Sequence, residues 1–224
     1  MILIIPVDNK NFRPCSCEVP VKHFLSAAVT TTLFLLLTTC GWTDEPAKAD
    51  KPAVKAKKVE VRDITLSIPE GWKQKPAASQ MRVAEFEVPP AGDDKEPGEY
   101  AVFFFGKGGA GGLQANIDRW VGQIEPEGRK VKIVAGESTL GKYTLVDLTG
   151  AYNKAIGPPI AGNKKRLPGW RVINVFIETE AGPYFLKLDG SAKTIASVEN
   201  EFRASFGGKK ETEKEQAAAD SKKP

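Results

Sequence analysis

The sequence predicts an α+β domain in which an antiparallel β-sheet is covered by two amphipathic helices. Apolar residues alternate by twos through most of residues 59–208, which is the period of strands that bury one face. Two segments of that region, residues 113–124 and 192–206, repeat instead at helical spacing. The connections between the expected strands are short, so strands that are neighbours in the chain are expected to pair in antiparallel fashion.

Turn residues separate the expected strands. Pro69 and Gly71 close the first strand, and the pair Pro89–Pro90 closes the second. The segments expected as strands are residues 64–68, 81–88, 100–105, 130–134, 137–140, 142–149, 170–179 and 184–188. Residues 152–169 are rich in Gly, Pro and Lys, and they are expected to form a long loop.

Each expected helix carries one apolar stripe. The stripe of the first helix consists of Leu113, Ile117, Trp120, Val121 and Ile124. Pro126 and Gly128 stop this helix. The stripe of the second helix consists of Ile195, Val198, Phe202 and Phe206. A helix with one apolar face buries it against another layer, so both are expected to lie on the sheet.

The folded domain is expected to lie between two charged segments. Residues 41–58 combine Pro, Ala and charges of both signs, which is typical of a flexible linker. Residues 209–224 are similarly rich in Lys, Glu and Ala and are expected to be a disordered tail. A domain of about 150 residues between them buries roughly 68–70% of its unfolded surface, so it requires neither a disulfide nor a metal.

Residues 1–40 are expected to be an export signal. Residues 24–39 carry no charge, and Lys22 and His23 stand just before them. A positive start, an apolar run of about 7–15 residues and then small residues is the form of a secretory signal peptide. The run is shorter than the roughly 20 apolar residues of a membrane-spanning helix. The protein is therefore predicted to reach the bacterial cell envelope or to be secreted.

The end of this signal predicts a lipid anchor at Cys40. The segment Leu37-Thr38-Thr39-Cys40-Gly41 resembles a bacterial lipobox, in which a cysteine after small residues is acylated and becomes the first residue. Thr39 departs from that pattern, which usually has Gly, Ala or Ser. Cleavage near residues 40–42 without acylation and an uncleaved anchor are the alternatives.

Composition excludes several chemistries. The only histidine is His23, and the only cysteines are Cys15, Cys17 and Cys40. The domain beyond them therefore lacks the residues of Ser-His-Asp or Cys-His catalysis and of zinc-protease helices. We expect no metal and no cofactor. A net charge of +4, from 32 basic and 28 acidic residues, also lacks the dense basic footprint of a nucleic-acid-binding protein.

Gly106, Gly108 and Gly111 fit the pattern G-x-G-x-x-G between an expected strand and an expected helix. A dinucleotide-binding turn needs that context, but it also needs alternating strands and helices, and only strands are expected between residue 130 and the last helix. We therefore expect a flexible connection. The alternative is a site for an anion or small molecule at the start of the helix.

Five residues around the expected loop are candidates for a contact surface. Tyr152 and Trp170 flank the loop, and Lys164, Lys165 and Arg166 supply positive charge within it. Long loops are often functional. A basic tip beside an aromatic side chain is suited to an acidic partner or a lipid headgroup.

The chain resembles the PsbP-like group of proteins. The resemblance lies in Ile68-Pro69-Glu70-Gly71-Trp72, in residues 116–123 after the glycine loop, and in residues 184–190 before the last helix. The group includes the PsbP subunit of photosystem II and a nuclear import factor that binds the Ran GTPase. Uncharacterised bacterial secreted proteins and lipoproteins are the most similar. The resemblance implies an α/β/α sandwich and a role in binding or assembly, and it assigns no functional residue.

These observations predict an exported, membrane-tethered, non-enzymatic binding or assembly domain whose partner is an unknown envelope protein. The alternative is a carrier of a small molecule or anion that uses the loop of Gly106, Gly108 and Gly111. The third hypothesis is a hydrolase that works through paired carboxylates. The acidic residues available to it are Glu85, Glu87, Asp147 and Asp189.

Overall fold

The computed structural model describes residues 54–216 except 78, 80, 110 and 158–161. The elements in this part of the chain are β1 (Ala56–Val61), β2 (Ile64–Pro69), β3 (Lys73–Lys75), β4 (Arg82–Val88), β5 (Gly98–Phe104), α1 (Leu113–Val121), β6 (Lys130–Ser138), β7 (Gly141–Ala155), β8 (Lys164–Thr179), β9 (Gly182–Ser191), α2 (Ala192–Ser205), the 3-10 helix η2 (Lys210–Thr212) and β10 (Lys214–Gln216). Strand β1 begins within the segment expected as a linker and continues into the expected domain, and β10 lies within the segment expected as a tail. The predicted signal and Cys40 lie outside the described residues.

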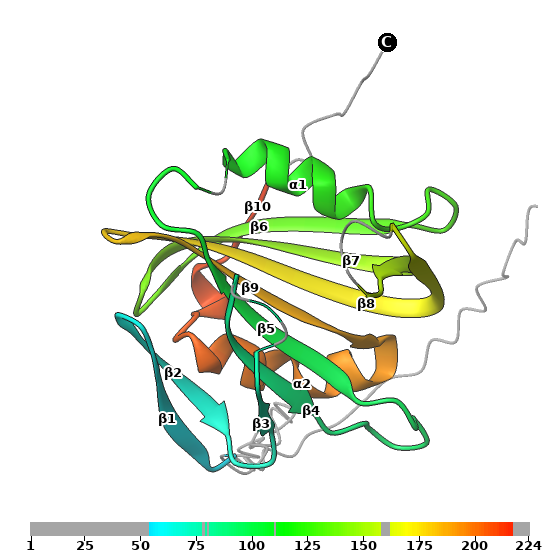
Figure 1. Ribbon diagram of the computed structural model, residues 1–224, viewed down its shortest axis with the longest axis horizontal. Coiled ribbons are helices and arrows are strands. Elements are labelled where there is room, and N and C mark those ends of the chain that lie inside the picture. Colours follow the sequence, from blue (N-terminus) through cyan, green and yellow to red (C-terminus); the bar gives the residue numbers. More distant parts are fainter. Residues whose placement is uncertain (1–53, 78, 80, 110, 158–161, 217–224) are drawn as a thin grey trace, which may run out of the picture. The chain divides into compact units, whose positions relative to one another are not determined.

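The main element is an eight-stranded sheet with the order β10-β6-β7-β8-β9-β5-β4-β3 (Figure 1). Its paired strands are antiparallel throughout. Strands β1 and β2 form a separate antiparallel hairpin. The short turns expected from the sequence join β6 to β7 and β8 to β9, because Gly141 and Gly182 allow tight reversals there.

Helix α2 and the β1–β2 hairpin pack on one face of the sheet, as Figure 1 shows. Tyr100 of β5 is fully buried there, and its ring lies edge-on to Trp72 at 5.6 Å and to Phe202 of α2 at 5.2 Å. The apolar stripe predicted for the second helix supplies Ile195, Phe202 and Phe206 to this core. The sheet, α2 and the β1–β2 hairpin therefore all contribute to this core, and α2 alone does not cover it.

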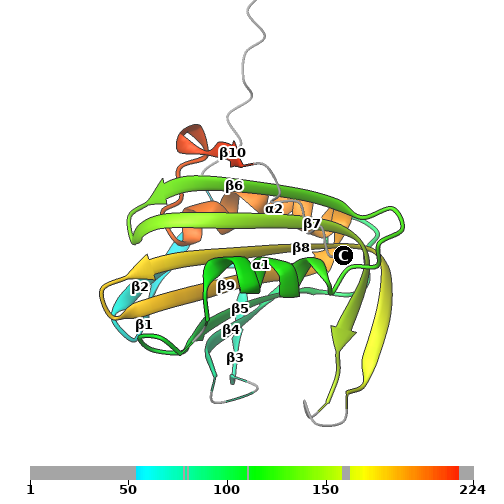
Figure 2. The ribbon, with the colours of Figure 1, turned by 90° about the horizontal axis from the view of Figure 1, so that it is seen from above.

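Helix α1 packs on the opposite face. Ile117 and Trp120 contact an apolar cluster that includes Val146, Val172 and Phe185. The helix has nine residues, so it covers only part of this face. Figure 2 shows it over β8 and β9, with β3, β4 and β10 beyond its edges.

The predicted fold class, an α+β sandwich in which two amphipathic helices cover the sheet, is wrong. Strands make up 53% of the structure, and the large antiparallel sheet has only two α-helices beside it in the described residues. The positions of both helices were expected, but the extent of the strands was not. The protein is mostly β.

Strands β7 and β8 account for much of the difference. Residues 152–169, expected as a loop, largely continue these two strands into a long hairpin, so that Tyr152 pairs with Leu167 and Ala155 with Lys164. Pro168 and Gly169 lie at a register shift opposite the segment from Gly150 to Tyr152. Proline and glycine are tolerated in strands at such bulges. Figure 2 shows this end of the hairpin extending beyond the other strands.

Candidate functional site

The two aromatic residues predicted for a contact surface lie in the interior. Tyr152 is 3% exposed and Trp170 is 8% exposed, and both belong to the core beneath α1. The hydroxyl of Tyr152 accepts a hydrogen bond of 2.5 Å from Lys187 Nζ. The indole Nε1 of Trp170 donates one of 3.1 Å to Asp189 Oδ1. The structure thus brings both aromatic residues into one buried polar cluster.

The three predicted basic residues lie apart from that cluster, on the outer part of β8. All three are exposed. Arg166 forms a bidentate pair with Glu125, with nitrogen–oxygen distances of 2.8 and 2.7 Å, and Lys165 lies 3.4 Å from Glu96. Because two of the three cations already have acidic neighbours, less positive charge is available to an acidic partner than the sequence alone indicated. The partner surface stays a prediction.

Asp189 is the centre of the buried polar cluster. Its side chain is 1% exposed, and Lys154 Nζ lies 2.8 Å from Oδ1 while Lys187 Nζ lies 3.7 Å from Oδ2. Burial opposes ionisation of Asp189 most strongly. The charges of Lys187 and Lys154 and the hydrogen bonds from Lys154 and Trp170 outweigh it, so the pKa of Asp189 lies below its usual value. We call Asp189, Lys154, Lys187, Tyr152 and Trp170 the Asp189 cluster.

The carboxylates considered for hydrolysis are each held by a basic side chain. Glu85 pairs with Arg82, Glu87 with Lys75, Asp147 with Arg171 and Asp189 with Lys154. The pKa values of Glu87, beside Lys75, and of Asp189 lie below their usual values, whereas a general acid needs a raised pKa. The hydrolase hypothesis gains no support from this arrangement.

The predicted glycine loop is the connection between β5 and α1. Gly106, Gly108 and Gly111 have φ angles of 74°, 74° and 72°, a left-handed conformation that glycine adopts without strain. These glycines therefore have a structural reason to be present, independent of any ligand. Phe103 and Phe105 come just before this loop in the chain, and α1 begins just after it.

One contact of the loop yields a test of its packing. A Cβ atom at Gly182 (φ 132°) would lie 2.7 Å from the carbonyl carbon of Gly106, whereas one at Gly108 would meet open space. Gly108→Ala is expected to cost about 1–2 kcal/mol of unfolding free energy, because of its left-handed backbone alone. Gly182→Ala should cost more, since the loop backbone must also move. Denaturant unfolding compares the two variants, and equal losses would contradict the close approach.

A small hollow lies between α1 and the strands β5, β8 and β9, and we call it the aromatic pocket. Its volume is about 150 Å³. Its walls are Phe103, Phe105, Arg119, Trp120, Gln123, Asn174, Phe185, Leu186 and Lys187. The rings of Phe103 and Phe105 are parallel, and those of Phe105 and Trp120 lie edge-on to Phe185 at 5.6 and 6.0 Å. The predicted glycine loop connects two of its walls.

The polar groups of the aromatic pocket are mainly hydrogen-bond donors. Asn174 is 2% exposed, and within the described part of the chain its Nδ2 atom has no hydrogen-bond partner. Lys187 lies directly opposite Asn174 on the neighbouring strand. Arg119 adds a second cation, and none of the described residues that line the pocket carries a carboxylate. An apolar hollow with a few convergent polar groups is the usual form of a small-molecule site.

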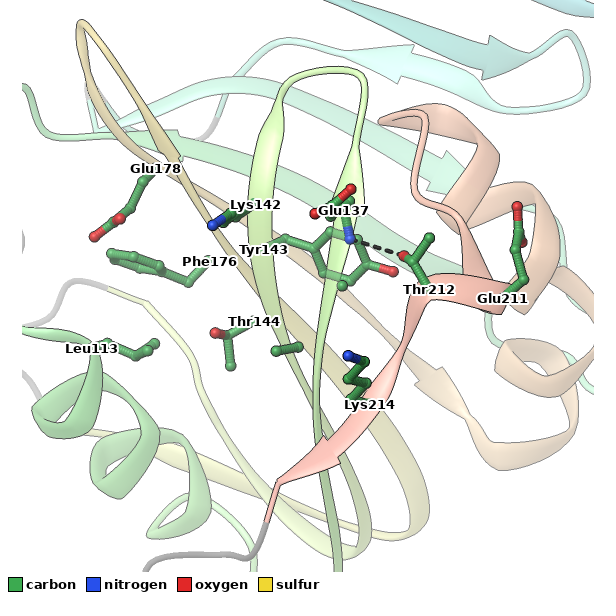
Figure 3. A pocket seen from close by; sticks show the side chains of 12 residues that line it. Leu113, Glu137, Lys142, Tyr143, Thr144, Phe176, Glu178, Glu211, Thr212 and Lys214 are labelled. Atoms are coloured by element: carbon green, nitrogen blue, oxygen red, sulfur yellow. Dashed lines mark hydrogen bonds between the residues drawn. The ribbon is translucent and has the colours of Figure 1, made fainter.

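A larger hollow of about 590 Å³ lies at the other end of α1 and is shown in Figure 3. Phe176, Thr144 and Leu113 line it together with exposed charges of both signs, among them Lys142 and Glu178. It is the more open of the two hollows. None of its lining side chains appears among the buried polar groups without a partner in the described structure. We therefore assign the candidate site to the aromatic pocket despite its smaller volume.

Asn174 and Lys187 were not identified from the sequence. Each interrupts an otherwise apolar run, Asn174 within residues 172–177 and Lys187 within residues 184–188. A polar residue at a position that alternation assigns to a buried face is a usable signal, because such groups are buried only with a partner or for a function. The register that places the two side by side was not accessible from the sequence.

Among the described residues, no helix is long and apolar enough to cross a membrane. No group of three or more His, Cys, Asp or Glu side chains in this part of the chain is arranged to hold a metal ion.

Comparisons with known proteins do not assign the chain to a family. No family model matches the chain, and no curated protein matches it. Among solved structures, the chain is similar to a crystal structure of PA94, a protein of unknown function from Pseudomonas aeruginosa, with 14% sequence identity and a TM-score of 0.36 over 66% of this chain and 91% of that one. A likeness of this size carries no argument about function. The resemblance to the PsbP-like group stays a sequence-based prediction.

Proposed function

We propose that this domain binds a small ligand in the aromatic pocket and carries out no chemistry on it. The observation that carries the proposal is Asn174, a buried residue that lines the pocket and whose Nδ2 donor has no partner among the described residues. Leaving a buried donor unsatisfied costs about 1–3 kcal/mol. A ligand acceptor within the pocket would remove that cost, so the arrangement favours an occupied site.

The dimensions of the pocket limit the ligand to a very small molecule. In another protein, an engineered apolar cavity of about 150 Å³ admits benzene. The aromatic pocket has a volume of about 150 Å³, and it is lined by four aromatic rings as well as polar groups. A single ring with one polar substituent matches this combination of size and lining.

The absence of chemistry rests on the residues that line the pocket. They include no Ser, Thr, Asp or Glu that would serve as a nucleophile or a general acid. Lys187 is engaged with the hydroxyl of Tyr152. Binding without turnover is therefore the function that these residues support best.

The predicted export signal and the lipid anchor at Cys40 complete the proposal. They would hold a ligand-binding domain at the bacterial envelope by a linker. Binding or assembly with an unknown envelope protein, through Lys164, Lys165 and Arg166, stays a separate prediction. It is not needed for the proposed ligand site.

The proposal is tested by blocking the mouth of the pocket. Gln123 lines the pocket from the turn after α1, and Gln114 lies exposed on α1. Gln123→Phe is expected to fill the pocket, and Gln114→Phe is the matched control. Single-ring probes are titrated against the full chain, and the NMR signal of the Trp120 indole is followed.

At least one of the probes benzoate, benzamide, benzyl alcohol and benzylamine is expected to shift the Trp120 signal saturably. The apparent affinity should fall at least about tenfold in Gln123→Phe, which corresponds to about 1.4 kcal/mol, and stay unchanged in Gln114→Phe. No saturable shift with any probe, or equal affinities in both variants, would refute the proposed site.

A further inference from the structure

We infer that the ligand of the aromatic pocket is a benzene-sized carboxylic acid, bound as its carboxylate. This inference rests on the proposed function and adds the chemical class of the ligand. The lining residues in the described part of the chain include two cations, Arg119 and Lys187, and no anion. The buried amide of Asn174 offers a further donor. The charged groups of the pocket wall are therefore cations, and an anionic ligand supplies the negative charge that complements them.

Lys187 is positioned to contact a carboxylate in the pocket. Its ammonium group has three N–H donors. One is used by the Tyr152 hydroxyl at 2.5 Å, while Asp189 Oδ2 lies 3.7 Å away, which is too far for a hydrogen bond. The Asp189 cluster thus fixes the direction of the side chain and leaves donor capacity for a ligand oxygen. The Lys187 side chain is 20% exposed, so it borders the pocket rather than being sealed away.

The strand register lets Asn174 and Lys187 share one ligand group. The two residues are direct partners in the antiparallel pair β8–β9. Side chains in such positions start about 4.5–5.5 Å apart at their Cβ atoms and lie on the same face of the sheet. One oxygen of a carboxylate can accept from the Asn174 amide while the other accepts from the Lys187 ammonium. Hydrogen bonds of this kind to a charged acceptor are about twice as strong as neutral ones.

The aromatic walls fit a flat ring attached to that carboxylate. Phe103 and Phe105 are stacked with an interplanar angle of 2°, and Phe185 stands edge-on to Phe105 at 81°. Trp120 closes the side formed by α1, edge-on to Phe185 at 76°. Aromatic rings prefer offset-stacked and edge-to-face contacts, and both are available to a ring in this position.

The charges also predict which related molecules are rejected. An amine of the same size would meet Lys187 and Arg119, two like charges, with no carboxylate in the pocket wall to balance it. A neutral amide would satisfy Asn174 but would gain no charge-assisted bond from Lys187. The expected order of affinity is therefore the acid, then the amide, with the amine excluded.

The test measures the binding of benzoate, benzamide and benzylamine to the full chain by calorimetry and NMR at neutral pH. A hydrogen bond to a charged group contributes about 1.5–3 kcal/mol, so benzoate is expected to bind at least about tenfold more tightly than benzamide. Asn174→Asp, which is nearly isosteric, places a like charge against the carboxylate and should weaken benzoate binding at least tenfold. Lys187→Gln should do the same, and Lys165→Gln, the same change outside the pocket, should have no effect.

The outcomes separate this inference from the proposed function. Equal binding of benzoate and benzamide, or preferential binding of benzylamine, would overturn the acid class and leave the ligand site standing. No binding of any probe to the pocket would overturn both. If Asn174→Asp does not fold, which its thermal unfolding would show, the comparison of Lys187→Gln with Lys165→Gln decides the question.

Discussion

Replacing Asp189 with alanine is expected to lower the free energy of unfolding by about 3–5 kcal/mol. The Asp189 side chain is 1% exposed and lies between Lys154 and Lys187. Its removal takes away the carboxylate that Lys154 and Lys187 share. Among the described residues, the remaining ion pair of Lys154 is with Glu99, which lies 3.2 Å away and is shared with Arg82. Removing one partner of a buried ion pair costs far more than the pair itself contributes, because the remaining charge stays desolvated.

Equilibrium unfolding in urea measures this loss. Glu96→Ala is the control, since it breaks the exposed contact with Lys165, where both side chains are more than half exposed, and should change stability by less than about 0.5 kcal/mol. The double variant Asp189→Ala with Lys154→Met should recover part of the loss. A loss below about 1 kcal/mol in Asp189→Ala would show that the cluster is not held by this carboxylate.

Asp189 is also expected to make the free energy of unfolding depend on pH in the acidic range. Because the pKa of Asp189 is lower in the folded state than its usual 3.8, its ionised form stabilises the fold at any pH above that value. This contribution is lost as the pH falls through the folded-state pKa. Stability of the wild-type chain should therefore fall below about pH 4 more steeply than that of Asp189→Ala. Parallel curves would contradict the assignment.

Trp120→Ala is expected to cost about 3–5 kcal/mol, the usual range for truncating a buried tryptophan. Helix α1 has nine residues, and helices this short depend on tertiary contacts. Trp120 is 6% exposed and packs against Phe185 in the core beneath α1. The variant should therefore release the helix and remove a wall of the aromatic pocket.

Hydrogen exchange distinguishes this outcome from a general loss of stability. The amides of α1 should lose protection far more than those of β7 and β8, whose packing on the opposite face through α2 is unchanged. Gln114→Ala, on the exposed side of α1, is the matched control and should alter neither helix protection nor stability by more than about 0.5 kcal/mol. Uniform loss of protection across the sheet would contradict a local role for Trp120.

Much of the local structure followed from sequence periodicity. The stripe of Ile117 and Trp120 predicted α1, and that of Phe202 and Phe206 predicted α2, because apolar residues at this spacing fall on one side of a helix but on both faces of a strand. Strand β4 ends before the predicted Pro89 stop. These elements depend on local signals, which is why they could be predicted.

The predicted fold class was wrong because the local sequence signals of two segments did not indicate the strands that form there. Pro168 and Gly169 favour a loop by composition, yet they occupy a bulge within β8, where neither disrupts the ladder. Strand β10 comes from a charged segment without apolar alternation, and it forms by pairing with β6 through its backbone. Pairing partners and bulges are properties of the assembled sheet and leave little trace in one sequence.

The residues that line the aromatic pocket were not predicted as site residues, although the glycine loop beside it was a candidate. Tyr152 and Trp170 were predicted to belong to a contact surface because they flank the expected loop, whereas the continued hairpin buries both. Asn174 and Lys187 converge because β8 and β9 pair in one particular register. A shift of one residue would move each to the other face, so no inspection of the strands alone could bring them together.

The most direct test of the ligand site is a titration of the isotope-labelled full chain with benzoate, observed at the side-chain amide of Asn174. The proposed site predicts that the Nδ2 proton signals move downfield and saturate together with the Trp120 indole signal, while signals around Lys142 and Lys214 in the larger hollow stay fixed. Unchanged Asn174 and Trp120 signals with benzoate and with the three other single-ring probes, with or without shifts in the larger hollow, would contradict the assignment of the aromatic pocket as the ligand site.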